Sequence, residues 1–278
     1  MKAANLRHAV YLSHCPFTIH HSLNLITIDA YLKRIRYDGP VGPTREVLKG
    51  LHRAQMFSVP FENLDILLGV PIELNLGKLY EKVVENRRGG FCYELNGLFG
   101  WLLKEIGFEI EMLEARVFGE EGEPGPHFDH MLLRVGGDQI ADVGFGDSFT
   151  EPMQFGYGEQ KQQTGLFKLV ENGERWELRR NDGDGWKPQY DFSLVSRDLD
   201  EYEPMCRHQQ TSPDSIFTKK KVCSLATPNG RITYANGRLI ETDGASKSER
   251  MIGNKAELEG VLEENFGVVL EGDLGKLF

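Results

Sequence analysis

The hydrophobic period of this 278-residue chain changes near Gly107, and that change constrains the fold most. Before it, apolar residues recur at helical spacing, as over Leu76–Val84 and from Cys92 to Gly107. After it, short strand-like runs alternate with turn signals such as Gly136-Gly137-Asp138 and Glu171-Asn172-Gly173. Helices followed by antiparallel strands predict an α+β protein.

The last third of the chain mixes both patterns. Asn236-Gly237, between Ile232–Tyr234 and Arg238–Glu241, is the strongest short hairpin signal in the sequence. Asn254, with Glu257 three residues later, then predicts the start of a helix. A small α/β unit is therefore expected after the strands.

Length and composition are those of a soluble globular protein. A chain of 278 residues suggests about two domains, with one to three allowed. No apolar run approaches the ~18 residues that a membrane-spanning helix needs. The 32 basic and 42 acidic residues give a net charge of −10, which argues against a nucleic-acid partner. A small anionic ligand remains compatible, because a local basic cluster can act inside an acidic field.

The cysteines are few and widely spaced. Cys15, Cys92, Cys206 and Cys223 form no C-x-x-C pair, so the spacing indicates neither a disulfide framework nor a zinc site. The N-terminal segment is too polar for a secretory signal. We therefore expect a reducing, cytoplasmic setting.

The segment Arg87-Arg88-Gly89-Gly90-Phe91-Cys92-Tyr93-Glu94 is the most informative stretch for chemistry. Its two glycines permit a tight turn and close backbone approach, and Cys92 falls at the predicted start of a helix. The N–H groups and dipole of a helix N-terminus favour a thiolate, so with a histidine nearby the pKa of Cys92 is expected below about 8.5. A small buried residue at a helix start is the alternative interpretation.

A thiol nucleophile needs a base and a group that orients it. His130 opens the predicted strand His130–Val135, and Asp142 lies between apolar residues on the strand expected to pair with it. A buried carboxylate needs a partner, and cross-strand neighbours lie within about 5 Å, so we expect His130 and Asp142 to touch. His127 is expected to be a surface residue.

Other interpretations of these residues stay open. His127 and His130 could bind a metal with Asp129 or Asp142, although residues three apart on a strand point to opposite faces. Gly144-Phe145-Gly146 would allow a ligand or another backbone to approach, or would form a barrel corner.

Two sets of charged residues near these motifs suggest further interactions. Lys219-Lys220-Lys221 could meet the phosphates of an anionic cofactor or protect a solvated edge strand. Glu62 lies in an apolar frame and could pair with Arg88 to fix the turn before Cys92. The phosphate-binding patterns G-x-x-x-x-G-K-[ST] and G-x-G-x-x-G are absent from the sequence.

Five motifs together, in this order and spacing, resemble the arylamine N-acetyltransferase family. They are VPFENLD (59–65), RRGGFCYELNGLF (87–99), HMLLRV (130–135), ADVGFG (141–146) and TSPDSIF (211–217). The resemblance runs from about Ile28 to Glu241.

The resemblance implies a cysteine-protease-like core built from three units. An N-terminal helical bundle over 23–107 would carry the nucleophile. A central antiparallel β-barrel over 108–205 would carry the histidine and aspartate. An α/β lid would follow over 206–278, and residues 1–22 would form an extension before the family's usual start.

The resemblance also implies roles for single residues. The catalytic residues would be Cys92, His130 and Asp142, with no role for His127. Cys206 stands where many members carry asparagine, so a local hydrogen bond is expected to be lost. The expected substrate-binding residues, in the acceptor pocket and on the coenzyme A side, are Gly144, Phe145, Gly146, Ser215 and Phe217.

The implied activity is ping-pong acetyl transfer from acetyl-CoA to arylamines or arylhydrazines through an acetyl-cysteine, a reaction of xenobiotic metabolism. It requires no metal, nucleic acid or membrane, and it leaves the oligomeric state open. The alternatives are a cysteine hydrolase or transglutaminase-like enzyme, an amide-bond-forming acyltransferase of the same family, and a non-catalytic binding module.

Overall fold

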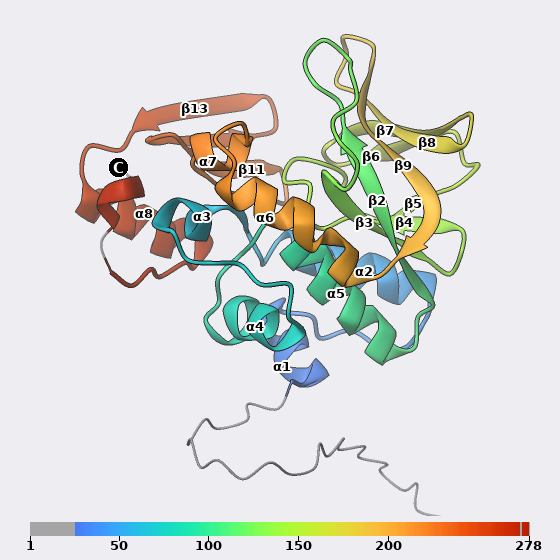
Figure 1. Ribbon diagram of the computed structural model, residues 1–278, viewed down its shortest axis with the longest axis horizontal. Helices are drawn as coiled ribbons and strands as arrows, with labels where there is room; N and C mark the ends of the chain where they lie inside the picture. The colour runs from blue at the N-terminus through green and yellow to red at the C-terminus, as the bar shows by residue number, and fades with distance from the viewer. Residues whose placement is uncertain (1–25, 273, 278) are drawn as a thin grey trace, which may run out of the picture.

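The computed structural model of the protein describes residues 26–272 and 274–277 (Figure 1). The extension predicted for residues 1–22, which includes Cys15, lies outside these described residues. The fold is α+β, as predicted: a helical part comes first, a nearly closed antiparallel barrel follows, and a second sheet with its own helices completes the chain.

The helical part follows the sequence pattern closely. The side chains of Thr27, Thr44 and Asn75 accept backbone N–H groups at three helix starts, and Gly107 ends the longest helix in a left-handed conformation. The run predicted over Leu76–Val84 is an α-helix that continues as a π-helical turn. The elements are α1 (Ile28–Arg34), α2 (Arg45–Met56), α3 (Leu64–Leu68), α4 (Leu76–Tyr80), η1 (Glu81–Glu85) and α5 (Cys92–Ile106).

Eight antiparallel strands form the barrel, in the order β5-β4-β3-β2-β9-β8-β7-β6. Two glutamine side chains bridge the seam: Gln160 bonds the backbone N–H and C=O of Gln154, and Gln162 does the same with Glu151. The strands are β2 (Ile110–Val117), β3 (His130–Val135), β4 (Gln139–Ala141), β5 (Met153–Gln154), β6 (Glu159–Gln162), β7 (Gly165–Asn172), β8 (Arg175–Asn181) and β9 (Trp186–Arg197).

The second sheet has the order β1-β10-β11-β12-β13, and its first strand comes from the helical part of the chain. The hairpin predicted at Asn236-Gly237 is confirmed, as is the helix capped by Asn254. The elements are β1 (Phe61–Glu62), η2 (Leu199–Tyr202), α6 (Glu203–Thr211), α7 (Ile216–Lys219), β10 (Val222–Thr227), β11 (Gly230–Ala235), β12 (Arg238–Asp243), β13 (Ser246–Met251), α8 (Lys255–Phe266) and η3 (Leu274–Leu277).

This topology corrects one of the two expectations for the lysine triplet. Lys219 ends α7, and Lys220 and Lys221 lead into β10. Since β10 pairs with β1 on one side and β11 on the other, the lysines do not protect a sheet edge.

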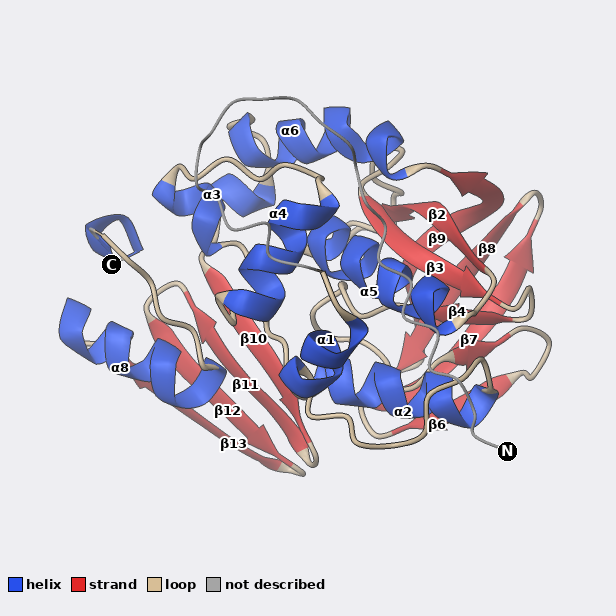
Figure 2. Cartoon of the chain, turned by 90° about the horizontal axis from the view of Figure 1, so that it is seen from below, coloured by secondary structure: helices blue, strands red, loops and turns tan. Residues whose placement is uncertain are grey.

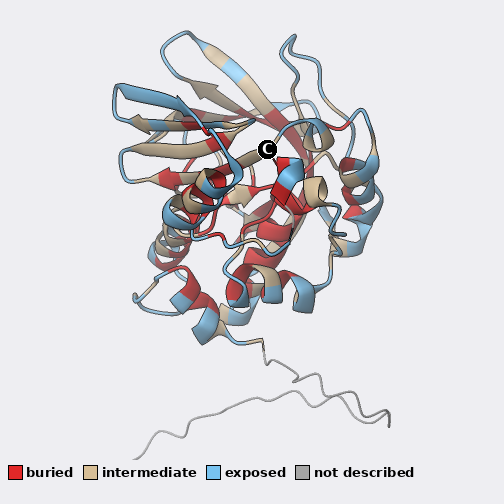
Figure 3. Cartoon of the chain, turned by 90° about the vertical axis from the view of Figure 1, so that its left-hand side faces the viewer, coloured by how far each residue is buried: buried red, intermediate tan, exposed pale blue. Residues whose placement is uncertain are grey.

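Helix α5 is the buried centre of the structure. Every residue from 91 to 100 is buried, and α5 contacts α1, α4, β2 and β3. Figure 2 shows the barrel and the second sheet at opposite ends of the molecule, and Figure 3 shows the buried positions concentrated in its interior. Helix α5, which begins at Cys92, is therefore held by both the helices and the barrel. Within the described residues, no helix has the length and apolar character needed to cross a membrane.

Candidate active site

Cys92 is the first residue of α5, and its side chain is buried. The two glycines before it serve close packing rather than an unusual backbone angle. A Cβ on Gly89 would lie 2.0 Å from the carbonyl oxygen of Pro60, whereas the positive φ of the turn (55°) belongs to Arg87. The turn is thus pressed directly against the strand that precedes α3.

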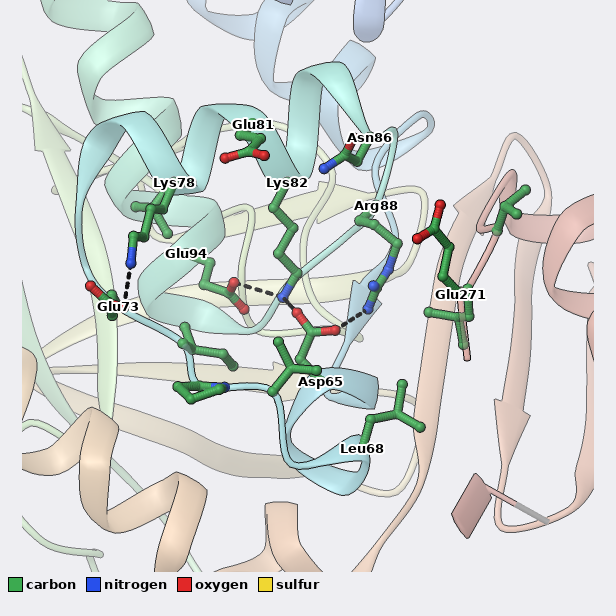
Figure 4. Close-up of a pocket in the computed structure, with 16 residues that line it drawn as sticks. Asp65, Leu68, Glu73, Lys78, Glu81, Lys82, Asn86, Arg88, Glu94 and Glu271 are labelled. Carbon is green, nitrogen blue, oxygen red and sulfur yellow. Dashed lines mark hydrogen bonds and ion pairs between the residues drawn. The ribbon is translucent and has the colours of Figure 1, made fainter. Parts of the chain in front are cut away.

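A largely buried ion-pair network contacts this turn through Arg88 (Figure 4). Arg88 Nη2 lies 2.8 Å from Glu62 and 2.7 Å from Asp65, so the predicted Glu62–Arg88 pair is confirmed. Lys82 Nζ lies 2.8 Å from Asp65 and 2.7 Å from Glu94. Burial raises the pKa of Glu94 to about 6 even though Lys82 opposes the shift. Its carboxylate also accepts the N–H of the residue before Cys92, which ties the network to the first turn of α5.

His130 and Asp142 are in contact, with Nε2 of the imidazole 2.8 Å from Oδ2 of the carboxylate. The contact itself was predicted from the sequence. The reason given, that the two residues are cross-strand neighbours, is wrong. Strand β4 ends at Ala141, which pairs with Leu133, so Asp142 already lies in the following loop. The loop turns its carboxylate back toward the first residue of β3.

The carboxylate of Asp142 is fully buried and fully hydrogen-bonded. Oδ1 accepts from Asn96 Nδ2 (2.9 Å) and the Gly144 N–H (3.0 Å), and Oδ2 accepts from Tyr190 (3.0 Å) as well as facing His130. Burial alone would raise the pKa of Asp142, but the charge of His130 and these hydrogen bonds outweigh it and hold the pKa below its usual value. The sequence analysis did not identify Asn96 or Tyr190.

The thiol of Cys92 is not acidic by itself. Burial raises its pKa, the carboxylates of Asp129 and Asp142 raise it further, and a hydrogen bond from the Met131 backbone lowers it only in part. The direction of this shift is opposite to the one expected for a thiol at a helix N-terminus beside a histidine, because burial and the two carboxylates dominate. A thiolate here requires a positively charged partner.

Cys92 and His130 line a common cavity of about 390 Å³. Its wall is mainly apolar, and aromatic rings from separate parts of the chain, including Phe145 and Phe217, contribute to it. The lining residues are Phe61, Cys92, Val117, Asp129, His130, Gly144, Phe145, Ile216, Phe217, Lys220, Lys221, Val222, Ala235 and Asn236.

Two residues expected at the substrate site lie behind the cavity wall. Gly146, with φ of 89°, packs against the ring of Phe61. The buried hydroxyl of Ser215 accepts the N–H of Phe217 and donates to Gln209, so it caps α7. Their role in substrate binding stays a prediction.

Gly144 lines the cavity and also meets another backbone. A Cβ on Gly144 would lie 2.7 Å from Cα of Cys92, so glycine permits the two segments to touch.

His127 is exposed, as expected, 3.4 Å from Glu114. Cys206 accepts a hydrogen bond from Gln210 Nε2 at 3.3 Å. Among the described residues no three His, Cys, Asp or Glu side chains gather as a metal site.

Comparison with known proteins finds close similarity over most of the chain. A family model described as N-acetyltransferase matches residues 44–274. An arylamine N-acetyltransferase of Gallus gallus (a pineal gland isozyme) is 34% identical, covering 88% of this chain and 94% of the relative. Arylamine N-acetyltransferase 1 of Homo sapiens is 32% identical, covering 89% and 96%.

Solved structures agree with the sequence comparison. The arylamine N-acetyltransferase from Salmonella typhimurium superimposes with a TM-score of 0.83 at 30% identity, covering 89% of this chain and 93% of the other. The Mycobacterium marinum arylamine N-acetyltransferase in complex with CoA gives 0.81 at 29% identity, covering 87% and 93%.

The network behind Cys92 predicts a stability effect. Glu62→Gln removes the more deeply buried of the two carboxylates that pair with Arg88, which is only partly exposed, while Asp65 remains, so we expect a loss of about 1–3 kcal/mol in the free energy of unfolding. Urea unfolding would measure it. As a control, Glu111→Gln breaks the more exposed pair with Arg134 and should change stability by less than about 1 kcal/mol. Equal stability of wild type and Glu62→Gln would contradict the role of the pair.

Proposed function

This chain belongs to the arylamine N-acetyltransferase family of acyltransferases, and we propose that it transfers the acetyl group of acetyl-CoA to aromatic amines and hydrazines through an acetyl-cysteine on Cys92. The observation that carries the proposal is that Cys92 and His130 line one apolar cavity while His130 is bonded to the buried carboxylate of Asp142. The cavity is lined by residues from each of the three expected segments: Cys92 from 23–107, His130 from 108–205 and Phe217 from 206–278.

The first half-reaction forms the acetyl-enzyme. Because Nε2 of His130 faces Asp142, Nδ1 is the ring nitrogen that takes the proton from the Cys92 thiol. The sulfur attacks the thioester carbonyl, a new S–C bond forms, and the bond to the coenzyme A sulfur breaks. His130 returns the proton to the leaving thiolate, and Asp142 stabilises the transient imidazolium.

The second half-reaction releases the product. The amine nitrogen attacks the acetyl-cysteine carbonyl, His130 takes its proton, and the Cys92 sulfur leaves and is reprotonated. Aromatic amines suit this step because they are neutral near pH 7, whereas alkylamines are protonated. The apolar wall around Phe145 and Phe217 suits an aromatic ring.

Negative charge on the tetrahedral carbonyl oxygen needs hydrogen-bond donors. The Cys92 N–H lies in the first turn of α5, where the helix supplies no carbonyl partner, so we assign it as one donor. A second backbone N–H would complete the oxyanion hole.

Coenzyme A carries phosphates, and the cavity has two cations at its wall. Lys220 and Lys221 line it close to Phe217 and Asn236. Binding of CoA by the M. marinum relative supports coenzyme A as the donor carrier here. We propose that the two lysines face the phosphates while the thioester reaches Cys92. The transfer itself needs no metal, and we propose a cytoplasmic setting, since reduced thiols and acetyl-CoA are both required.

The reaction class can be tested by intact mass. Incubation with acetyl-CoA alone should add one acetyl group to the wild type and none to Cys92→Ala, because only the thiolate can form the acetyl-enzyme. An arylamine should then discharge the adduct. Steady hydrolysis of acetyl-CoA with no transfer to amine would indicate a hydrolase instead. Lack of an adduct together with an inert Cys92 would contradict the proposal.

The lysine assignment predicts a dependence on the acetyl donor. Lys220→Glu combined with Lys221→Glu should raise KM for acetyl-CoA about tenfold, or ~1.4 kcal/mol, because the phosphates lose two cations. Acetylation by p-nitrophenyl acetate, which has no phosphate, should stay unchanged. Lys219→Glu is the matched control, since Lys219 does not line the cavity. Equal losses with both donors would refute the assignment.

A further inference from the structure

We propose that His52 is a positioning residue for this reaction, a buried neutral histidine that anchors the main chain of Asp142 and so aims its carboxylate at His130. The inference rests on the proposed function for its catalytic consequence. Its structural basis is independent of that function and lies in two backbone hydrogen bonds.

The partners of His52 determine its tautomer. Nε2 lies 3.2 Å from the backbone nitrogen of Asp142, and Nδ1 lies 2.9 Å from the carbonyl oxygen of Thr150. A backbone N–H can only donate and a carbonyl can only accept. Nε2 must therefore carry the lone pair and Nδ1 the proton.

The surroundings of His52 keep the ring neutral. The side chain is fully buried, stacks on Phe149 (ring centroids 5.6 Å apart, planes at 18°) and meets the ring of Phe99 nearly edge-on at 6.2 Å. Burial lowers the pKa of His52 to about 4, although Thr150 and Asp142 oppose the shift. A protonated ring would lose the lone pair that accepts the Asp142 N–H.

The hydrogen bond to Asp142 replaces a missing strand contact. The ladder between β3 and β4 ends at the Leu133–Ala141 pair, so the next N–H, that of Asp142, has no place in the sheet. His52 accepts it, and through Thr150 holds the same loop again before β5 begins. The loop between these two points carries Gly144 and Phe145 of the cavity wall.

Helix α2 is well placed for this task because other side chains on it reach the same loop and the turn before β4. Lys49 and Arg53 both pair with Glu151, at 2.8 and 2.7 Å, and Arg45 pairs with Asp138. These pairs are partly exposed, and such pairs contribute little to stability. His52 is a buried residue of α2 that bonds to this loop at both Asp142 and Thr150.

Two amide variants, each of which can keep one of the two hydrogen bonds of His52, separate positioning from general packing. In His52→Gln, the amide oxygen can occupy the Nε2 position and accept the Asp142 N–H. In His52→Asn, the amide nitrogen can occupy the Nδ1 position and donate to Thr150, but the Asp142 N–H loses its partner. We propose to measure single-turnover acetylation of Cys92 at saturating acetyl-CoA, the KM for acetyl-CoA, and thermal stability.

We expect His52→Gln to stay within about threefold of the wild-type rate, and His52→Asn to fall by about tenfold or more, because small displacements of a catalytic group are costly. KM should stay unchanged in both variants. Lys49→Gln, which weakens the docking of α2 without touching Asp142, is the control and should react at the wild-type rate. Equal rates in the Gln and Asn variants, or losses that follow thermal stability alone, would overturn the proposal.

Two further measurements keep the test decisive. If neither variant folds, nitrogen NMR of histidine-labelled wild type must show the Nδ1–H tautomer near pH 7, and an Nε2–H tautomer or an imidazolium would overturn the proposal. Alkylation of Cys92 by iodoacetamide gives the same comparison without acetyl-CoA. Failure of the wild type to form an acetyl-enzyme would therefore refute the proposed function and leave the His52 test intact.

Discussion

The buried carboxylate of Asp142 is the charge around which the site is built. An ionised carboxylate removed from water is costly unless hydrogen bonds and a counter-charge surround it. Here the donors come from separate elements: Asn96 from α5, Tyr190 from β9 and His130 from β3. Burial and the adjacent carboxylate raise the pKa of Tyr190, so its hydroxyl stays a donor. The hydrogen bonds that stabilise this one carboxylate therefore also join the helical part to the barrel.

The reactivity of Cys92 follows from this arrangement. Burial and nearby carboxylates disfavour its thiolate, so the helix N-terminus alone does not activate it. An imidazolium at His130 changes that balance, and Asp142 stabilises the imidazolium. The ion-pair network around Arg88 and Lys82 contributes by geometry, because it stabilises the turn that positions the sulfur of Cys92. His130 and Asp142 of the barrel therefore activate the Cys92 thiol, and the helical part of the chain positions it.

Many helix ends and turns of the fold could be predicted from the sequence, because they depend on local interactions. The helix start at Asn254, the helix end at Gly107 and the hairpin at Asn236 each depend on a few neighbouring residues. The other hydrogen-bond partners of Asp142 could not be predicted from the sequence. Asn96, Tyr190 and His52 are 46, 48 and 90 residues away from it, and only the packing of α5, β9 and α2 brings them close. The His130–Asp142 contact was predicted from a strand register that the loop after β4 does not follow.

The most direct test of this account is the pH dependence of Cys92 alkylation by iodoacetamide in the wild type and in Asp142→Asn, with folding checked by circular dichroism. The wild-type thiol should react well below the ordinary cysteine pKa of about 8.5, because the imidazolium stabilised by Asp142 pairs with the thiolate. In Asp142→Asn the profile should move to higher pH, and the rate near pH 7 should fall by about tenfold or more. Superimposable profiles would show that Asp142 does not control the nucleophile, and would contradict the account.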